Sequence, residues 1–223
     1  MKDKLLAIQQ EFIRCDLCDL GGQGNGIING NWANQRDFVE VDPTIMFVID
    51  RHDMAILSQR RSPAGAYRGI ARWFLEQHGM DLEHYWCTPA VICPTAIPDP
   101  DVWPPLEYMP LPKVKQYSAC RPRLHREILV VEPEVIIALG NVAVKALWPK
   151  NPPKFQTSLG ELHTLQIPGS IGPRNFDVLV SHSLSDLHRN EDQHIKGGLW
   201  NQVYNHIGLA KSVANHLDAL RPE

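Results

Sequence analysis

Four cysteines are spaced as metal ligands would be. Cys15 and Cys18 form a Cys-x-x-Cys pair, in which two thiolates can face one metal. A structural zinc site usually closes with a second such pair or with His-x-x-x-His, and the sequence has neither, so the other ligands would be single residues, Cys93 and Cys120. Isolated cysteines fit a four-thiolate iron–sulfur cluster at least as well. The spacing predicts a metal site without naming the metal, and Cys87 is expected to be a core thiol.

Polar residues directly follow the apolar segments of the chain. They are Asp50-Arg51-His52-Asp53 after 45–49, Cys93 after 90–92, Gly140-Asn141 after 135–139, and Ser181-His182-Ser183 after 176–180. In a parallel sheet, ligands bind beyond the carboxyl ends of the strands, so these residues should share one rim. Asp50 and His182, which we expect at adjacent strand ends, are the candidates for chemistry there. The alternatives are a helix-capping or arginine-paired role for Asp50 and a structural role for His182.

The apolar segments themselves predict the fold class. Continuous apolar runs at 45–49, 135–139 and 176–180, and a short one at 90–92, are typical of strands buried on both faces. Helical patterns lie between and around them, at 5–13, 64–78 (ended by Gly79), 113–131, 141–147 and 199–220. Pro122 either kinks the helix at 113–131 or marks its start. This alternation predicts a three-layer α/β/α fold with a central, mostly parallel, four-stranded sheet.

The composition favours one soluble globular domain. The 223 residues are 43% hydrophobic and 21% charged, which argues against disorder, and no apolar run approaches the ~20 residues that cross a bilayer. The start of the chain does not resemble a signal peptide, so we expect a cytoplasmic, monomeric protein with reduced cysteines. Residues 1–223 form a single domain in this interpretation, with a proline-rich insertion at about 94–112.

The charge balance restricts any binding of polyanions to local patches. The formal net charge is −3, so the whole molecule does not attract nucleic acid. Two arginine-rich stretches are candidates, and each could instead be a solvated helix face. They are Arg51, Arg60, Arg61, Arg68 and Arg72, and then Arg121, Arg123, His125 and Arg126.

The order of these motifs resembles a known family. The segments that show the resemblance are Cys15-Asp-Leu-Cys18, the strand 45–49, the segment from Tyr85 to Pro94 that ends in Ile-Cys-Pro, Cys120-Arg-Pro-Arg-Leu, and the run from Pro133 to Ala143. They are similar to the CxxC, VGExPG, VKCRPP, CxPxL and PxVIVALGxxA motifs of the iron–sulfur, family 4-like branch of the uracil-DNA glycosylase superfamily. The resemblance implies that Cys15, Cys18, Cys93 and Cys120 bind a [4Fe–4S] cluster.

The sequence departs from this family at the active-site motifs. The VGExPG turn is replaced by Ile49-Asp50-Arg51-His52-Asp53, which keeps only an acid, at Asp50. By ungapped counting, the aromatic residue that stacks on uracil falls on Pro63, and the asparagine that reads uracil falls on Thr88 or Pro89. The family's HPSxLLR motif keeps His182, and it keeps Arg189 only with a one-residue insertion.

The resemblance implies a DNA glycosylase with an altered pocket. It would act on a base flipped from a duplex or in a single strand and leave an abasic site. Asp50 would stabilise the cationic sugar or orient water, and His182 would stabilise the departing base. Without the stacking aromatic and the asparagine, uracil should be a poor substrate, and a bulky, hypermodified pyrimidine of viral DNA fits better. The expected pocket residues are Arg51, His52, Pro63, Thr88 and Pro89, and the expected DNA contacts are Arg60, Arg61 and Arg189.

Two other function classes remain open. One is a non-catalytic nucleic-acid-binding module that retains the cluster and the sheet. The other is an interaction protein that docks through the proline-rich segment around Trp103-Pro104-Pro105-Leu106. A nucleotide- or flavin-binding protein is disfavoured, because the sequence contains no GxGxxG or GxxxxGK[ST] loop.

Overall fold

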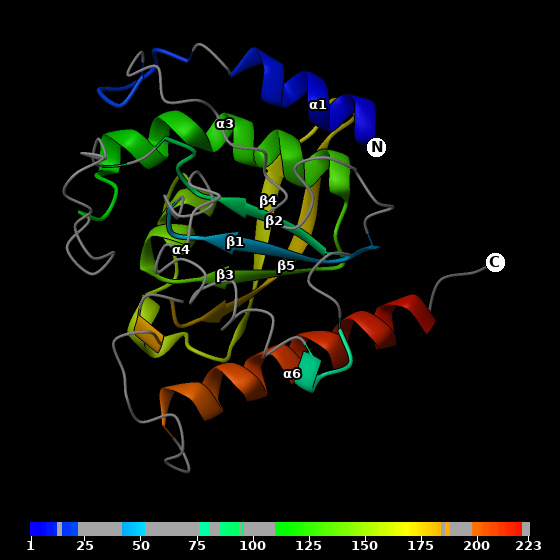
Figure 1. Ribbon diagram of the computed structural model, residues 1–223. Helices are drawn as coiled ribbons and strands as arrows, with labels where there is room; N and C mark the ends of the chain where they lie inside the picture. Colours follow the sequence, from blue (N-terminus) through cyan, green and yellow to red (C-terminus); the bar gives the residue numbers. More distant parts are fainter. Residues whose placement is uncertain are drawn as a thin grey trace.

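The computed structural model describes residues 1–12, 15–21, 42–51, 76–80, 85–93, 95, 110–183, 186–187 and 198–219. Figure 1 shows the arrangement of their helices and strands. The elements are α1 (Lys2–Glu11), β1 (Asp42–Ile49), β2 (Tyr85–Pro89), α3 (Val114–Val131), β3 (Val135–Leu139), α4 (Asn141–Leu147), the 3₁₀ turn η4 (Phe155–Thr157), β4 (Leu162–Pro168), β5 (Pro173–Ser181) and α6 (Leu199–Ala219). None of the described helices is long and apolar enough to cross a bilayer.

The sheet has five strands in the order β2-β1-β3-β5-β4. The first four are parallel, and β4 pairs antiparallel with β5. The α/β class is confirmed, whereas the prediction of four strands was wrong. The extra strand is an edge strand in which only Leu165 and Ile167 are buried, so it lacks the continuous apolar run that marks the inner strands.

Helices cover both faces of the sheet. Met46 and Val48 of β1 face the core that includes α1, α3 and α4, whereas Ile45, Phe47 and Ile49 face the core that includes α6. Figure 1 shows α1 and α3 together on one side of the strands and α6 on the other. This two-sided burial explains why β1 and β3 are apolar at consecutive positions.

Most predicted boundaries agree with the structure, and β2 differs. The strand at 135–139 and the helix at 141–147 lie where the sequence predicts them. The second strand is Tyr85–Pro89 rather than 90–92, and residues 90–92 continue beyond it as a buried segment. Most of the helix predicted at 64–78 and of the insertion at about 94–112 lies outside the described residues, although Gly79 ends a helical turn with φ of 65°.

Helix α3 holds the far end of α4. It begins at Val114, so Pro122 lies inside it and does not mark its start. Arg121 donates from Nε and Nη2 to the carbonyl oxygens of Ala146 (2.8 Å) and Lys145 (2.9 Å), and His125 lies 2.7 Å from the carbonyl oxygen of Leu147. These contacts satisfy carbonyl groups that the last turn of a helix leaves without partners. The carboxyl end of α4 is thereby fixed against α3.

Candidate active site

The carboxyl ends of the inner strands meet at one rim, as the sequence predicts. The backbone nitrogen of Gly140, after β3, donates to the carbonyl oxygen of Ser181 at the end of β5 (3.0 Å). The nitrogen of Ala90, after β2, donates to the carbonyl oxygen of Ile49 at the end of β1 (2.7 Å). Asp50, Gly140 and His182 therefore follow parallel strands at the same edge of the sheet.

The Asp50 carboxylate is fixed by the first turn of α4. Its Oδ1 accepts a hydrogen bond from the backbone nitrogen of Ala143 (2.8 Å), and its side chain occupies the space in which a Cβ at residue 140 would lie. Gly140, with φ of 106°, leaves that space free. The geometry thus includes the helix-capping contact that is the alternative to catalysis for this residue. The two roles are compatible, because such a contact also fixes the direction of the carboxylate.

Burial makes this carboxylate a weak acid. It raises the pKa of Asp50 from 3.8 to about 7, while N–H groups of Ala143 and Val142 oppose the rise in part. Among the charged neighbours, Asp186 raises the pKa and Arg51 lowers it. A carboxyl group that titrates near neutrality suits a proton acceptor or an orienter of water, because it gains and loses a proton near the working pH.

His182 is separated from Asp50 by one strand. The sequence interpretation placed the two residues at adjacent strand ends, which is wrong, because β3 lies between β1 and β5. The error arose because chain order does not reveal which strands are neighbours. At ~5 Å per strand, the two strand ends lie ~10 Å apart, with Gly140 between them.

A second group of side chains orients His182. Its Nε2 lies 2.8 Å from Oε1 of Gln202, and its ring stacks with that of His206 at 6.3 Å between centroids. His206 Nδ1 in turn lies 2.9 Å from Oγ of Ser181. Burial, and to a smaller extent His182, lowers the pKa of His206 to about 4. The sequence analysis did not identify Gln202 and His206. The available signal was their spacing of four residues, which places them on one face of α6, next to buried Val203 and Ile207.

The predicted base pocket is only partly described. Arg51 is buried beside Asp50, whereas His52 and Pro63 lie outside the described residues. Thr88 is fully buried, and its Oγ1 accepts a hydrogen bond from Nη1 of Arg123 (2.8 Å). A base could reach Thr88 only if this pair rearranged.

The four cysteines of the predicted metal site converge on one region. Cys15, Cys18 and Cys93 pack, partly buried, against the core cluster that includes Cys120. Burial and then the charges of Cys120, Cys18 and Cys15 raise the pKa of the Cys93 thiol to about 12. Yet no three His, Cys, Asp or Glu side chains in the described ranges are placed to hold a metal ion. Cys87 is buried on the opposite face of the sheet, as expected of a core thiol.

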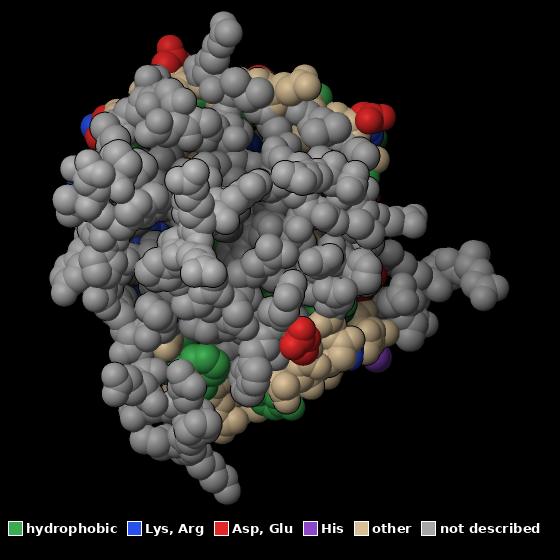
Figure 2. All heavy atoms as spheres, viewed as in Figure 1, with side chains coloured by type: hydrophobic (Ala, Val, Ile, Leu, Met, Phe, Trp, Pro, Cys, Tyr) green, Lys and Arg blue, Asp and Glu red, His purple; other side chains and the backbone are tan. Residues whose placement is uncertain are grey.

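The second arginine-rich stretch serves internal contacts. Arg121 and His125 contact carbonyl groups of α4, Arg123 is buried, and Arg126 pairs with Glu11 (2.7 Å). Among the described side chains in Figure 2, acidic groups stand apart near the upper edge and in the lower half of this face, and Lys and Arg show only in small areas. The predicted DNA contacts Arg60, Arg61 and Arg189 lie outside the described residues.

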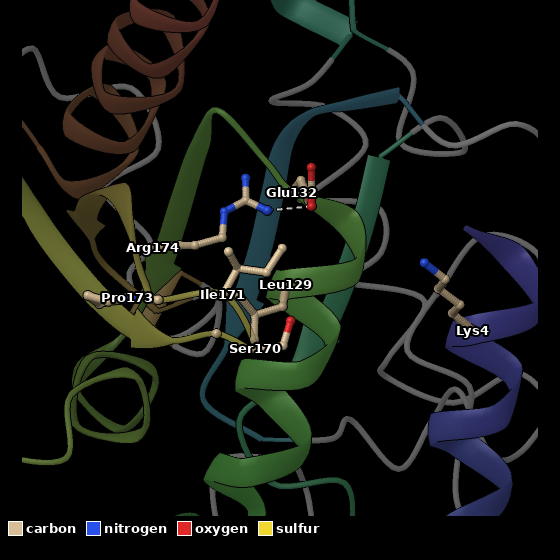
Figure 3. Close-up of a pocket in the computed structure, with 9 residues that line it drawn as sticks. Lys4, Leu129, Glu132, Ser170, Ile171, Pro173 and Arg174 are labelled. Atoms are coloured by element: carbon tan, nitrogen blue, oxygen red, sulfur yellow. Dashed lines mark hydrogen bonds and ion pairs between the residues drawn. The ribbon is translucent and has the colours of Figure 1, made fainter.

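A hollow of about 460 Å³ lies away from this rim. It lies where the end of α3 meets the β4–β5 turn, and Figure 3 shows Arg174 directed toward Glu132, with which it forms an ion pair. Arg174 belongs to the start of β5, whereas Ser181 and His182 follow its other end. The hollow is therefore separate from the candidate active site.

Comparison with known families gives one match. The family model described as "Uracil DNA glycosylase superfamily" matches residues 67–205, which include β2, α3, β3, α4, β4 and β5 and the start of α6. No curated protein matches the chain.

Proposed function

Because the chain belongs to the uracil DNA glycosylase superfamily, we propose that it hydrolyses the N-glycosidic bond of a modified base in DNA and leaves an abasic site. Members of this superfamily are generally DNA glycosylases. The substrate we propose is a base with a bulky polar substituent, such as a hypermodified pyrimidine of viral DNA. DNA is the expected partner, with the base flipped from a duplex or presented in a single strand.

The observation that carries the proposal is the Asp50 carboxylate at the rim. Breaking the bond to the base leaves positive charge on the sugar, and water must then add to the anomeric carbon. Asp50 is held by Ala143 and Val142, so its orientation costs nothing when the charge develops. In its ionised form it would stabilise the sugar cation and accept the proton of the attacking water.

His182 would stabilise the departing base from the other side of Gly140. Gln202 offers its Oε1 to Nε2 of the ring, so Nε2 carries a hydrogen and Nδ1 is left for other partners. Nδ1 of the neutral ring can only accept a hydrogen bond, whereas Nδ1 of the protonated ring donates one. The protonated form of His182 is therefore the form that would offset the negative charge of the leaving base.

The residues present fit the [4Fe–4S] cluster that we propose as the cofactor. Cys15, Cys18, Cys93 and Cys120 lie near enough for their charges to interact. The chain has neither a second Cys-x-x-Cys pair nor a His-x-x-x-His pair to close a structural zinc site, and single cysteines fit a four-thiolate cluster at least as well. When bound, the cluster would tie the N-terminal segment that carries Cys15 and Cys18 to α3 through Cys120. No step of the hydrolysis requires it.

The residues at the expected pocket positions disfavour uracil as the substrate. Neither an aromatic nor an asparagine occupies the positions where the family motifs place them, since these are Pro63 and Thr88 or Pro89. A site without the partner that reads the edge of uracil loses discrimination by orders of magnitude. Arg51 is a polar group that could instead contact a substituent near Asp50.

The decisive experiment screens natural DNAs for base release. Purified protein is incubated with genomic DNAs that carry different base modifications and with uracil-containing DNA, and alkali-labile sites are counted, with Asp50→Asn as the matched control. Abasic sites in one modified DNA and few in uracil DNA would support the proposal. Efficient uracil release would contradict the modified-base substrate. Binding without abasic sites in any DNA would indicate a non-catalytic binding module.

A further inference from the structure

One buried arginine bridges the end of β2 and a glutamate of its own helix. Arg123 on α3 is 1% exposed. Its Nη1 donates to Oγ1 of Thr88 (2.8 Å) and to Oε1 of Glu127 (2.7 Å), and its Nη2 donates to the carbonyl oxygen of Pro89. Glu127 also accepts a hydrogen bond from Nε1 of Trp86 (3.4 Å). These contacts fix the segment of β2 that leads to Cys93.

One hydrogen-bond donor of this arginine is unused. Nε of Arg123 is buried and has no hydrogen-bond partner in the part of the chain that the structure describes. A buried N–H without an acceptor destabilises the folded state, because it has lost its hydrogen bonds to water. Burying the whole Arg–Glu pair is also not a favourable way to stabilise a core, because apolar side chains of similar volume often do as well or better. The pair is therefore better explained by a specific role.

The same arginine lies beside two of the four cysteines. Cys120 precedes it by three residues on α3, a spacing that places both on one face of the helix. The backbone nitrogen of Ile92 donates to Cys120, so the residues that precede Cys93 contact the same helix face. In agreement with this placement, Arg123 lies near enough to both Cys93 and Cys120 for its charge to act on them.

We propose that Arg123 is a positioning residue that couples the cysteine-bound group to the base-binding end of β2. Its two Nη atoms hold Thr88 and Pro89, and its Nε and its charge serve the anionic sulfur ligands of Cys93 and Cys120. Glu127 moderates that charge. The cysteine half of this inference rests on the iron–sulfur cluster put forward under the proposed function.

The test compares variants that change charge in opposite directions. Arg123→Met removes a positive charge near the cluster, so the midpoint potential should fall, because the reduced cluster carries more negative charge. Arg123→Lys restores the charge and should recover most of the potential. Glu127→Gln removes a negative charge and should raise the potential. Arg126→Met makes the same charge change as Arg123→Met at an exposed position of α3 and should leave the potential unchanged.

Each variant is first assayed for iron and sulfide per chain. Opposite shifts for Arg123→Met and Glu127→Gln support the inference, since a purely structural role would not reverse sign. If Arg123→Met loses its iron, the midpoint potentials of Arg123→Lys and Glu127→Gln are compared instead. A raised potential for Glu127→Gln, with little change for Arg123→Lys, then supports the inference. Unchanged potentials in iron-loaded variants would overturn the role of Arg123 alone. Absence of iron from the anaerobically purified wild-type protein would overturn the cluster proposal, and the inference with it.

Discussion

Oδ1 of Asp50 lies 2.8 Å from the backbone nitrogen of Ala143, and the carboxylate reaches it across the place where Gly140 has no side chain. A residue at the end of β1 is thus held by a helix that follows β3. The direction of the carboxylate depends on Gly140 and on the position of α4 together.

Gly140→Ala should destabilise the protein strongly. Its φ of 106° strains any other residue by about 1–3 kcal/mol, and the added methyl group would collide with the Asp50 carboxylate. Gly172→Ala is the matched control, because φ is 144° there and nothing lies within 4 Å of the added carbon. Urea unfolding should show a clearly larger loss for Gly140→Ala. Equal losses would mean that the collision is relieved at no cost.

Asp50→Asn should slow base release by ~100-fold or more in single-turnover assays while leaving DNA affinity nearly unchanged, because it removes charge stabilisation that exists mainly in the transition state. Since burial raises the pKa of Asp50 to about 7, the wild-type rate should rise with pH through that region as the carboxylate ionises. The variant should lack this rise. Full activity of Asp50→Asn would show that the carboxylate has only its capping role.

The same substitution should stabilise the fold at high pH. The pKa of Asp50 in the folded state, about 7, lies above its ordinary value of 3.8. Its protonated form therefore favours folding, and that contribution is complete below pH ~4 and is lost as the pH rises to ~7. The amide of the Asp50→Asn variant cannot ionise, so the advantage of the variant should grow over this range to at most roughly 4 kcal/mol. Unfolding free energies from pH 4 to 8 would measure it, and a constant difference would contradict it.

Gln202→Leu should reduce base release by roughly 10- to 100-fold, because His182 loses the acceptor that fixes its ring. Gln202→Glu keeps an acceptor and should retain most of the activity. Asn205→Ala, an exposed position on the same helix, is the control. If Gln202→Leu and Asn205→Ala behave alike, Gln202 does not position His182.

Cys120→Ser should yield colourless, less stable protein, whereas Cys87→Ser should keep its iron. Both thiols are buried, so simple loss of core packing would affect the two variants similarly. Iron and sulfide analysis after anaerobic purification separates these effects. Stoichiometric zinc without iron in the wild-type protein would contradict the proposed cofactor.

The sequence was most informative where several signals coincided. The strand at 135–139 is a continuous apolar run directly followed by glycine, and both it and the helix after it were located to the residue. The second strand was misplaced, because the apolar run at 90–92 is more conspicuous than the mixed residues of Tyr85–Pro89. The edge strand β4 was missed, because a strand with one exposed face and little apolar character resembles a loop.

For the candidate site, the sequence predicted which residues lie at the rim of the sheet, but it did not predict the contacts between them. Asp50 and His182 follow strands, and strand ends share an edge in any parallel sheet. Their separation by β3 depends on the crossovers, and the pairing of His182 with Gln202 depends on which face α6 presents. The arginine-rich stretch at 121–126 shows the same limit. Its charge was compatible with a polyanion site or with a solvated helix face, whereas in the structure these side chains contact other parts of the protein.

The concentration of supporting contacts on α3 has a consequence for how such a protein changes in evolution. Within two turns, this helix supplies contacts to three regions. Arg121 and His125 contact α4, Arg123 contacts the end of β2, and Cys120 lies in the core cluster against which the other three cysteines pack. The residues that would touch a base lie at the ends of the strands or in the segments after them, outside that helix. Substrate preference can then be altered by substitutions that leave the supporting framework intact. We expect relatives with other substrates to differ chiefly in those segments.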